Sequence, residues 1–349
     1  MDGKKQKHDL QNDKQKPRHF SPVILSLLII LIAGILISFG IGRYPISPRE
    51  LFAAVLPRSW NIADVTDQMR AILFNVRLPR VILSCLIGCC LSAAGASYQG
   101  VFQNPMASPD ILGASSGAAT GAALALLLQL SSRYVMLFAF AGGLVTIALV
   151  MLVSKTARGN KLLRIILAGI MISSLCNAMT SYIKLVADPN NILPEITYWL
   201  MGSLAKTKVS DVEFAAIPML VGSVPLLLLR WRMNLLTLPD SEARTMGVNV
   251  GVTRAIVIIC ATLITAASVS VSGLIGFVGL VVPHLARKFV GNNYKRLLPV
   301  SMIGGALFLL IVDNFSRNLL VTEIPIGILT AVIGAPFFIW MITRRSDTV

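Results

Sequence analysis

The chain has 349 residues, of which 55% are hydrophobic and 13% are charged, and its formal net charge is +15. A basic excess can indicate nucleic-acid binding, but here the Lys and Arg residues lie between apolar stretches and form no continuous basic patch, so we predict no nucleic-acid partner. The five cysteines all lie within apolar stretches, and we expect small buried hydrophobes there, not disulfides or metal ligands.

Ten apolar stretches organise the sequence. They lie at about residues 23–42, 81–102, 110–130, 134–154, 162–187, 210–229, 255–273, 274–290, 297–315 and 324–343. About 20 apolar residues in a helix match the hydrocarbon thickness of a bilayer, and these stretches lack the alternation of barrel strands. We therefore predict an all-α polytopic membrane protein with about ten transmembrane helices, in which residues 21–345 form one transmembrane domain in contact with membrane lipid.

One pair of stretches leaves the number of spans open. Residues 255–290 must hold two helices, with Ser270-Val271-Ser272-Gly273 between them. A single helix followed by a re-entrant segment is the alternative, and it would give nine spans. Glycines recur every three residues from Gly273 to Gly279, which suits a tight hairpin or an irregular helix start.

The distribution of basic residues predicts the orientation. With ten spans and a cytoplasmic N-terminus, the inner segments hold 20 of the 31 Lys and Arg residues. Basic residues favour the cytoplasmic side, so we place both termini in the cytoplasm, in a multi-pass protein of the cell membrane. Residues 1–20 are polar and lysine-rich, and we expect a disordered basic cytoplasmic tail there.

Small residues recur along the second and third stretches. Gly88, Ser92, Ala96 and Gly100 are spaced four residues apart, and Gly113 begins a similar series with Gly117 and Gly121. Such faces let helices approach closely in lipid. Between the two stretches, Ser108 is expected to cap a helix that has Pro109 in its first turn.

The longest inner loop is a candidate docking element. It covers about residues 233–252, where Pro239 and Asp240 can begin a short helix and Gly247 can end it. No Walker A motif occurs in the chain, so a motor for active transport would have to be a separate subunit. We predict no catalytic residue, no metal site and no cofactor, and hence no enzyme. Within the apolar stretches Asp313 is the clearest charge, with Arg317 at the spacing of a helical ion pair.

Several motifs carry a resemblance to a known family. In chain order they are Arg77-Leu78-Pro79-Arg80, Asn104-Pro105-Met106-Ala107-Ser108-Pro109, Leu167-Ala168-Gly169, Tyr198-Trp199-Leu200-Met201-Gly202-Ser203, Ala243-Arg244-Thr245-Met246-Gly247, Gly276-Phe277-Val278-Gly279-Leu280-Val281-Val282-Pro283-His284 and Glu323-Ile324-Pro325-Ile326-Gly327. Together they resemble the BtuC/FecCD-type permease subunits of ABC importers for iron–siderophores, haem or cobalamin, and the match covers essentially residues 20–345.

The resemblance implies a fold, partners and a mechanism. It implies a BtuC-like ABC transporter permease fold and a second permease subunit, identical or homologous. Two ABC ATPase subunits would bind at the inner face, and an extracytoplasmic substrate-binding protein would deliver the cargo. The passage would open alternately to the two sides, driven by ATP hydrolysis on the ATPase subunits.

The resemblance also assigns roles to residues. The ATPase coupling loop corresponds to Asp240, Glu242, Ala243, Arg244 and Gly247. Docking of the binding protein is assigned to Arg77, Arg80 and Arg317, which are expected to meet its glutamates. The inner gate corresponds to Leu162 and Leu163, at the start of the fifth stretch.

The cargo and the class of transporter leave alternatives. An iron–siderophore is our expectation for the cargo, with haem and cobalamin next. An ion-coupled secondary transporter is the main alternative, and it requires an ion site near the membrane midplane, for which the sequence offers only Asp313. A membrane-embedded enzyme or assembly scaffold is the second alternative, and it lacks a reactive cluster or a large soluble face.

Overall fold

The computed structural model describes residues 20–42, 44, 46–55, 66–156 and 161–345, and all regular secondary structure in them is helical. Except for Phe20, the predicted tail at residues 1–20 lies outside the described residues. Each of the ten apolar stretches contains one helix. These helices are α2 (Phe20–Gly40), α5 (Leu78–Val101), α6 (Ala114–Leu127), α7 (Ser132–Thr156), α8 (Lys161–Val186), α10 (Val209–Leu236), α12 (Val250–Ser272), α13 (Val278–Val290), α14 (Tyr294–Asn318) and α15 (Ile326–Arg345).

Short elements connect the long helices. They are α3 (Pro48–Val55), α4 (Asp67–Ile72), the π-helical turn η2 (Leu73–Arg77), the 3-10 turn η3 (Pro109–Leu112), α9 (Ile192–Leu200) and α11 (Asp240–Thr245). Ser108 is the residue before η3, as expected, but its side chain makes no capping hydrogen bond. The left-handed Gly113 then separates η3 from α6, so the third long helix begins later than the apolar stretch.

The two helices at residues 255–290, for which the sequence left the number of spans open, differ in length. In the described part of the chain seven helices are long and apolar enough to span a bilayer, and α12 is among them. The 13 residues of α13 cover about 20 Å, or two-thirds of the hydrocarbon thickness. Between the two helices Gly273 and Phe277 both have positive φ. Irregular backbone at membrane depth is tolerated where protein buries it, and residues 273–277 are buried or half-buried.

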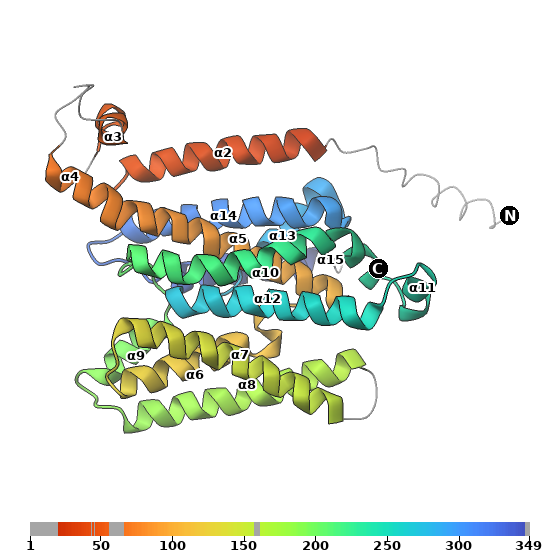
Figure 1. The fold of residues 1–349 in the computed structure, drawn as a ribbon. Coiled ribbons are helices and arrows are strands. Elements are labelled where there is room, and N and C mark those ends of the chain that lie inside the picture. Colours follow the sequence, from red (N-terminus) through yellow and green to blue (C-terminus); the bar gives the residue numbers. More distant parts are fainter. Residues whose placement is uncertain (1–19, 43, 45, 56–65, 157–160, 346–349) are drawn as a thin grey trace.

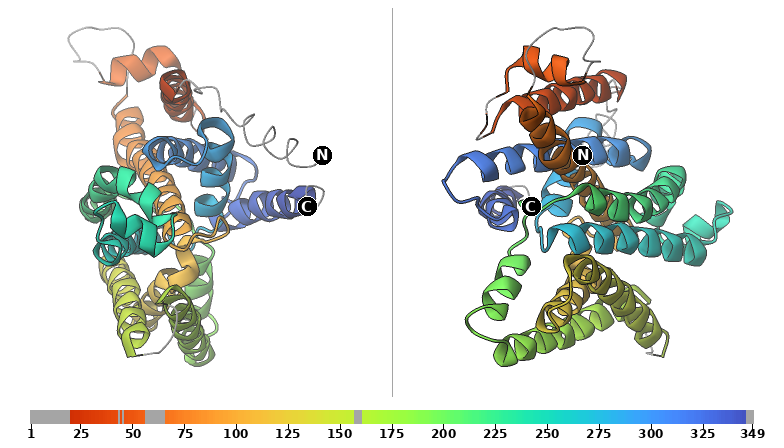
Figure 2. Two further views of the ribbon diagram at one scale, coloured as in Figure 1. Left: turned by 90° about the vertical axis from the view of Figure 1, so that its right-hand side faces the viewer. Right: turned by 60° about the vertical axis from the view of Figure 1, so that its left-hand side comes forward.

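The long helices run roughly parallel to one another, with α11 projecting beyond the bundle at one end and α3, α4 and α9 at the other (Figure 1). We call the end with α11 the inner end and the opposite end the outer end, following the predicted orientation. Helix α2 begins and helix α15 ends towards the inner end (Figure 1). Figure 2 shows α15 standing out to one side of the bundle, where its contacts are with α13 and α14.

Helix α5 is the centre of the packing. It contacts α10, α12, α13 and α14, and its glycines allow backbones to touch. A Cβ atom on Gly88 would lie 2.1 Å from the carbonyl oxygen of Gly305, and one on Gly95 would lie 1.9 Å from that of Gly279. These distances leave no room for a side chain, so the small-residue face predicted for the second stretch is a helix–helix contact.

A second group of helices, α6 to α9, packs around its own core. A Cβ atom on Gly117 would lie 2.5 Å from the carbonyl oxygen of Gly142, and one on Gly121 would lie 2.1 Å from that of Phe138. The glycine face of α6 therefore packs against α7, as the sequence predicts. Helix α8 closes this group, and only 17% of its apolar window is buried.

Candidate functional site

The predicted docking helix at the inner end is present as α11. It follows α10 after a short turn, and the Ala243 N–H donates to the Pro239 carbonyl oxygen at 3.1 Å. Ala243 is buried, whereas Glu242 and Gly247 are exposed. Gly247 has a φ of +79°, the left-handed conformation in which helices commonly end. The segment between α10 and α12, residues 237–249, contains α11 and is shorter than the predicted loop of about 233–252, because α10 continues to Leu236 and α12 begins at Val250.

The joint between α11 and α12 is well defined. Asn249 caps α12, and its side chain accepts a hydrogen bond from the Val252 N–H at 3.2 Å. Helix α12 then runs through the buried centre of the molecule and ends at the Gly273 turn. A displacement of α11 would therefore act directly on a long, buried helix.

At the outer end, Arg77, Arg80 and Arg317 lie together but are buried. Their exposed fractions are 5%, 4% and 8%. Arg80 pairs with both oxygens of Asp313, with its Nε 2.9 Å from Oδ1 and 3.2 Å from Oδ2, and its Nη1 lies 2.9 Å from Glu323 Oε2. The helical pair predicted between Asp313 and Arg317 is confirmed, with 3.3 Å between Oδ2 and Nε.

The other bonds of this cluster tie it to the start of the chain. Arg77 donates to the carbonyl oxygens of Phe39 and Tyr44, and Arg317 donates to the Ser38 hydroxyl at 2.7 Å. The cluster therefore joins α2, α5 and α14. Burial and internal pairing differ from the open docking surface that the sequence suggests. All three arginines nevertheless line a cavity of about 180 Å³ at this end, together with Glu323.

Sequence reasoning missed two pairings in the cluster, those of Arg80 with Asp313 and with Glu323. Arg80 and Asp313 are 233 positions apart, so no periodicity could pair them. Glu323 belongs to one of the family motifs, but nothing in its position along the chain indicates a contact with Arg80. The expectation of a buried cation opposite an isolated intramembrane acid would have found the Arg80–Asp313 pair.

The two predicted gate residues face different ways. Leu162 is half-buried and packs against the main core, whereas the Leu163 side chain is 55% exposed. Both lie in the first turn of α8, at the inner end. Only Leu163 is free to contact a second subunit or a passing solute, and the role of both residues in gating stays a prediction.

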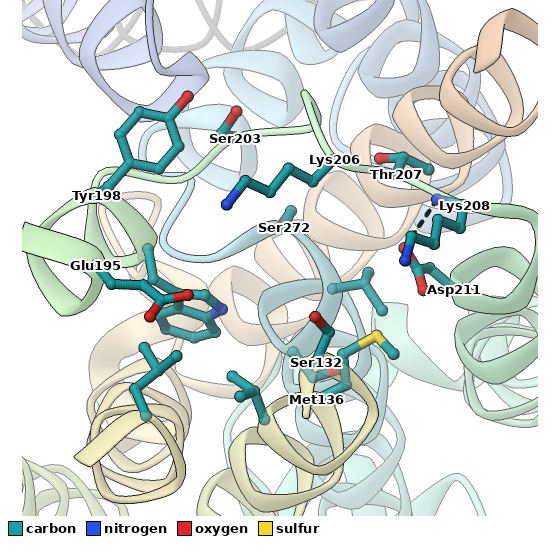
Figure 3. A pocket seen from close by; sticks show the side chains of 15 residues that line it. Ser132, Met136, Glu195, Tyr198, Ser203, Lys206, Thr207, Lys208, Asp211 and Ser272 are labelled. Atoms are coloured by element: carbon teal, nitrogen blue, oxygen red, sulfur yellow. Dashed lines mark hydrogen bonds between the residues drawn. The ribbon is translucent and has the colours of Figure 1, made fainter. Parts of the chain in front are cut away.

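A second outer feature is a pocket of about 380 Å³ between α7, α9, α10 and α12. Figure 3 shows Glu195 and Tyr198 on one side of it and Lys208 and Asp211 on the other, where the Lys208 N–H donates to Asp211 Oδ2 at 2.9 Å. Lys206 also lines this pocket. Because both signs of charge line it, the pocket favours neither anions nor cations. Among the described residues, no group of three or more His, Cys, Asp or Glu side chains is arranged to hold a metal ion.

These features are those of a polytopic membrane protein with a short helix that projects at one end. The chain belongs to the FecCD transport family, whose sequence model matches residues 30–344. The molybdate import system permease protein MolB of Haemophilus influenzae is 38% identical over 323 residues, which are 93% of this chain and 96% of MolB. The hemin transport system permease protein HmuU of Yersinia pestis is 37% identical over 343 residues, covering 96% of this chain and 98% of HmuU.

A solved structure supports the fold. An inward-facing metal-chelate type ABC transporter superposes with a TM-score of 0.84 at 37% identity, covering 93% of this chain and 99% of the other. The chain is therefore an ABC importer permease of the FecCD family, a membrane-embedded transport protein and not an enzyme. The predicted fold is confirmed, and nothing in the comparisons supports an ion-coupled secondary transporter.

Proposed function

We propose that this chain carries a metal chelate into the cytoplasm by alternating access, driven by two ABC ATPase subunits that dock on α11. The observation that carries the proposal is the position of α11, which projects beyond the bundle (Figure 1). Its buried Ala243 holds it to the body of the protein while Glu242 stays exposed. The coupling residues are Asp240, Glu242, Ala243, Arg244 and Gly247, and both termini would lie on the same, cytoplasmic side.

An iron–siderophore is the cargo we propose, with haem or cobalamin next. Relatives differ in this respect. HmuU is named for hemin and MolB for molybdate, so membership of the family leaves the cargo open. Uptake of labelled chelates and of labelled molybdate in a strain that lacks the gene, with and without the gene restored, identifies it. Restored uptake of molybdate alone would contradict the proposal of a chelate.

A second permease subunit would complete the passage. Helix α8 has an exposed apolar side along its length, formed by Leu163, Leu167, Ile170, Met171 and Leu175. Lipid could cover such a surface, but a second copy or a homologue would also bury it, and the gate residues lie at its inner end. We propose that α8 faces the partner permease.

The outer arginines are proposed to receive an acidic side chain of the substrate-binding protein. The support is the cavity of about 180 Å³ that Arg77, Arg80 and Arg317 line together with Glu323, so that three cations and one carboxylate border it. Arginine binds carboxylates through paired hydrogen bonds. Reversing the charge with Arg77→Glu should weaken binding of the substrate-binding protein to proteoliposomes, and unchanged affinity in a folded variant would refute this assignment.

Substitution in α11 tests the coupling role. Glu242→Gln should reduce ATP-driven uptake while leaving the thermal midpoint of the purified protein unchanged. Glu213→Gln is the matched control, since Glu213 is also exposed but lies near the start of α10 at the outer end. Equal uptake by the two variants would contradict a role for Glu242 in coupling.

A further inference from the structure

A cleft of about 760 Å³ opens at the inner end, between the ends of several helices. It lies where the last turns of α5, α13 and α15 meet the first turn of α14. The residues that line it are Gln99, Gln103, Asn104, Pro105, Thr237, His284, Arg287, Lys288, Asn292, Tyr294, Trp340 and Met341. None of these described residues is Asp or Glu, in contrast to the outer pocket, where Lys206 and Lys208 are balanced by Glu195 and Asp211.

The cations of the cleft are held in place. Arg287 donates to Gln99 Oε1, with an Nη1–Oε1 distance of 2.5 Å, and its Nη2 lies 3.4 Å from the Tyr294 hydroxyl. Both partners are uncharged, so neither offsets the positive charge that Arg287 presents to the cleft. Lys288 Nζ lies 5.0 Å from the centre of the Trp340 ring, a cation–π distance. Basic residues in the last turn of α13 also suit the helix dipole, but that effect does not account for the cleft beside them.

The cleft adjoins the segment that leads into α11. Gln103 Nε2 donates to the carbonyl oxygens of Leu236 and Leu238 at 3.0 and 3.1 Å. Leu238 lies two residues before Asp240, where α11 begins. On the other wall, Asn234 accepts from the Tyr294 N–H at 2.8 Å. A ligand in the cleft would therefore brace the base of α11.

We propose that this cleft binds the phosphate headgroup of an anionic phospholipid of the inner leaflet, such as cardiolipin or phosphatidylglycerol. Basic pockets between transmembrane helices on the cytoplasmic side are suited to such headgroups. Trp340 and Met341 supply apolar surface beside the cations, where acyl chains would continue along α15. The assignment to the inner leaflet rests on the proposed orientation. A soluble oxyanion shares the headgroup chemistry and is the competing source.

Native mass spectrometry of the full-length protein tests the proposal. Purified protein is titrated with cardiolipin, with phosphatidylglycerol and with zwitterionic phosphatidylcholine. We expect retention of the anionic lipids by the wild type. The double variant Arg287→Gln with Lys288→Gln should weaken it about 25-fold, since each basic residue contributes about a fivefold factor near an anionic surface.

The control removes the same charge from the same end. The control is the double variant Lys295→Gln with Arg296→Gln. Both residues lie in the first turn of α14 and outside the cleft lining, so retention of anionic lipid should stay within about twofold of the wild type. Equal losses in the two double variants would show non-specific attraction and overturn the site. If the double variant at Arg287 does not fold, Lys288→Gln alone still decides, with about a fivefold loss expected and no loss as the contrary result.

Competition with inorganic phosphate distinguishes a lipid headgroup from a soluble oxyanion as the ligand. Inorganic phosphate at millimolar concentration should leave lipid retention unchanged if the acyl chains contribute to binding. Displacement of the lipid by phosphate, or binding of phosphate without retention of lipid, would identify a soluble oxyanion and overturn the lipid assignment. The measurement needs no transport, so its failure is separate from failure of the proposed import function.

Discussion

Helices α5 and α8 have the same hydropathy and opposite environments. The segment Asp67–Val101, which contains α5, and the segment Leu162–Val186 of α8 both have a mean hydropathy of 1.8 in their most apolar windows, yet 78% of the first window is buried and only 17% of the second. The difference lies in small residues, because Gly88 and Gly95 bring α5 into backbone contact with α14 and α13. Hydropathy identifies a membrane helix, and small-residue spacing identifies which of its faces lies in close contact with another helix.

The comparison has a functional consequence. The α5 contacts leave no freedom to slide, and the Arg80 cluster fixes its outer end to α2 and α14. Helix α8 has its main contacts with α6, α7 and η3. An importer needs both a fixed scaffold and an element whose surroundings change, and we assign these roles to α5 and α8.

The largest predicted effect is on the α5 seam. Gly95→Ala places a Cβ atom 1.9 Å from the Gly279 carbonyl oxygen, and we expect a loss of more than about 3 kcal/mol of stability or failure to fold. Gly276→Ala is the matched control, since a Cβ atom there meets nothing within 4 Å. The yield and the thermal midpoint of the two variants in detergent are the measurements. Equal midpoints would contradict a close backbone contact between α5 and α13 at Gly95.

The next effect is on the ion-pair cluster. Arg80→Gln leaves Asp313, with no exposed surface, without its closest cation and should cost about 3 kcal/mol in unfolding free energy. Adding Asp313→Asn should restore part of that loss, because the uncompensated buried charge is then removed. A double variant in which the two losses simply add would show that the pair is not coupled.

Matched leucine truncations sharpen the contrast between the two helices. Leu83 in α5 has no exposed surface and Leu175 in α8 is 59% exposed. Leu83→Ala should cost about 2 kcal/mol or more through the cavity it leaves, and Leu175→Ala should cost less than about 0.5 kcal/mol in the isolated chain. Denaturation of both variants in the same detergent is the measurement, and a comparable loss in each would place α8 in the scaffold.

A smaller effect on stability than that of Leu83→Ala is expected at Gly247. Gly247→Ala meets no atom within 4 Å, so its cost comes from the positive φ alone and should be about 1 kcal/mol. Because Gly247 follows the proposed coupling helix α11, ATP-driven uptake should fall further than stability does. Unchanged uptake together with a shifted thermal midpoint would assign the glycine a purely local role.

Much of the fold follows from the sequence because its signals are local. The apolar stretches predict the ten long helices, Pro239 and Gly247 predict α11, and the four-residue spacing predicts the glycine contacts. The shortness of α13 follows from the turn at 273–277, whose two positive-φ residues are not marked by hydropathy. The burial of the three arginines and the pairing of Arg80 with Asp313 and Glu323 depend on tertiary packing, so the sequence could not predict them.

Reconstitution with purified subunits tests the central claim most directly. The chain is placed in proteoliposomes with its binding protein and labelled chelate, with and without the ATPase subunits, in the presence of ATP or of an imposed ion gradient. Uptake only when both ATPase subunits and ATP are present is the predicted result. Accumulation driven by the ion gradient in vesicles that hold the chain alone would contradict the account.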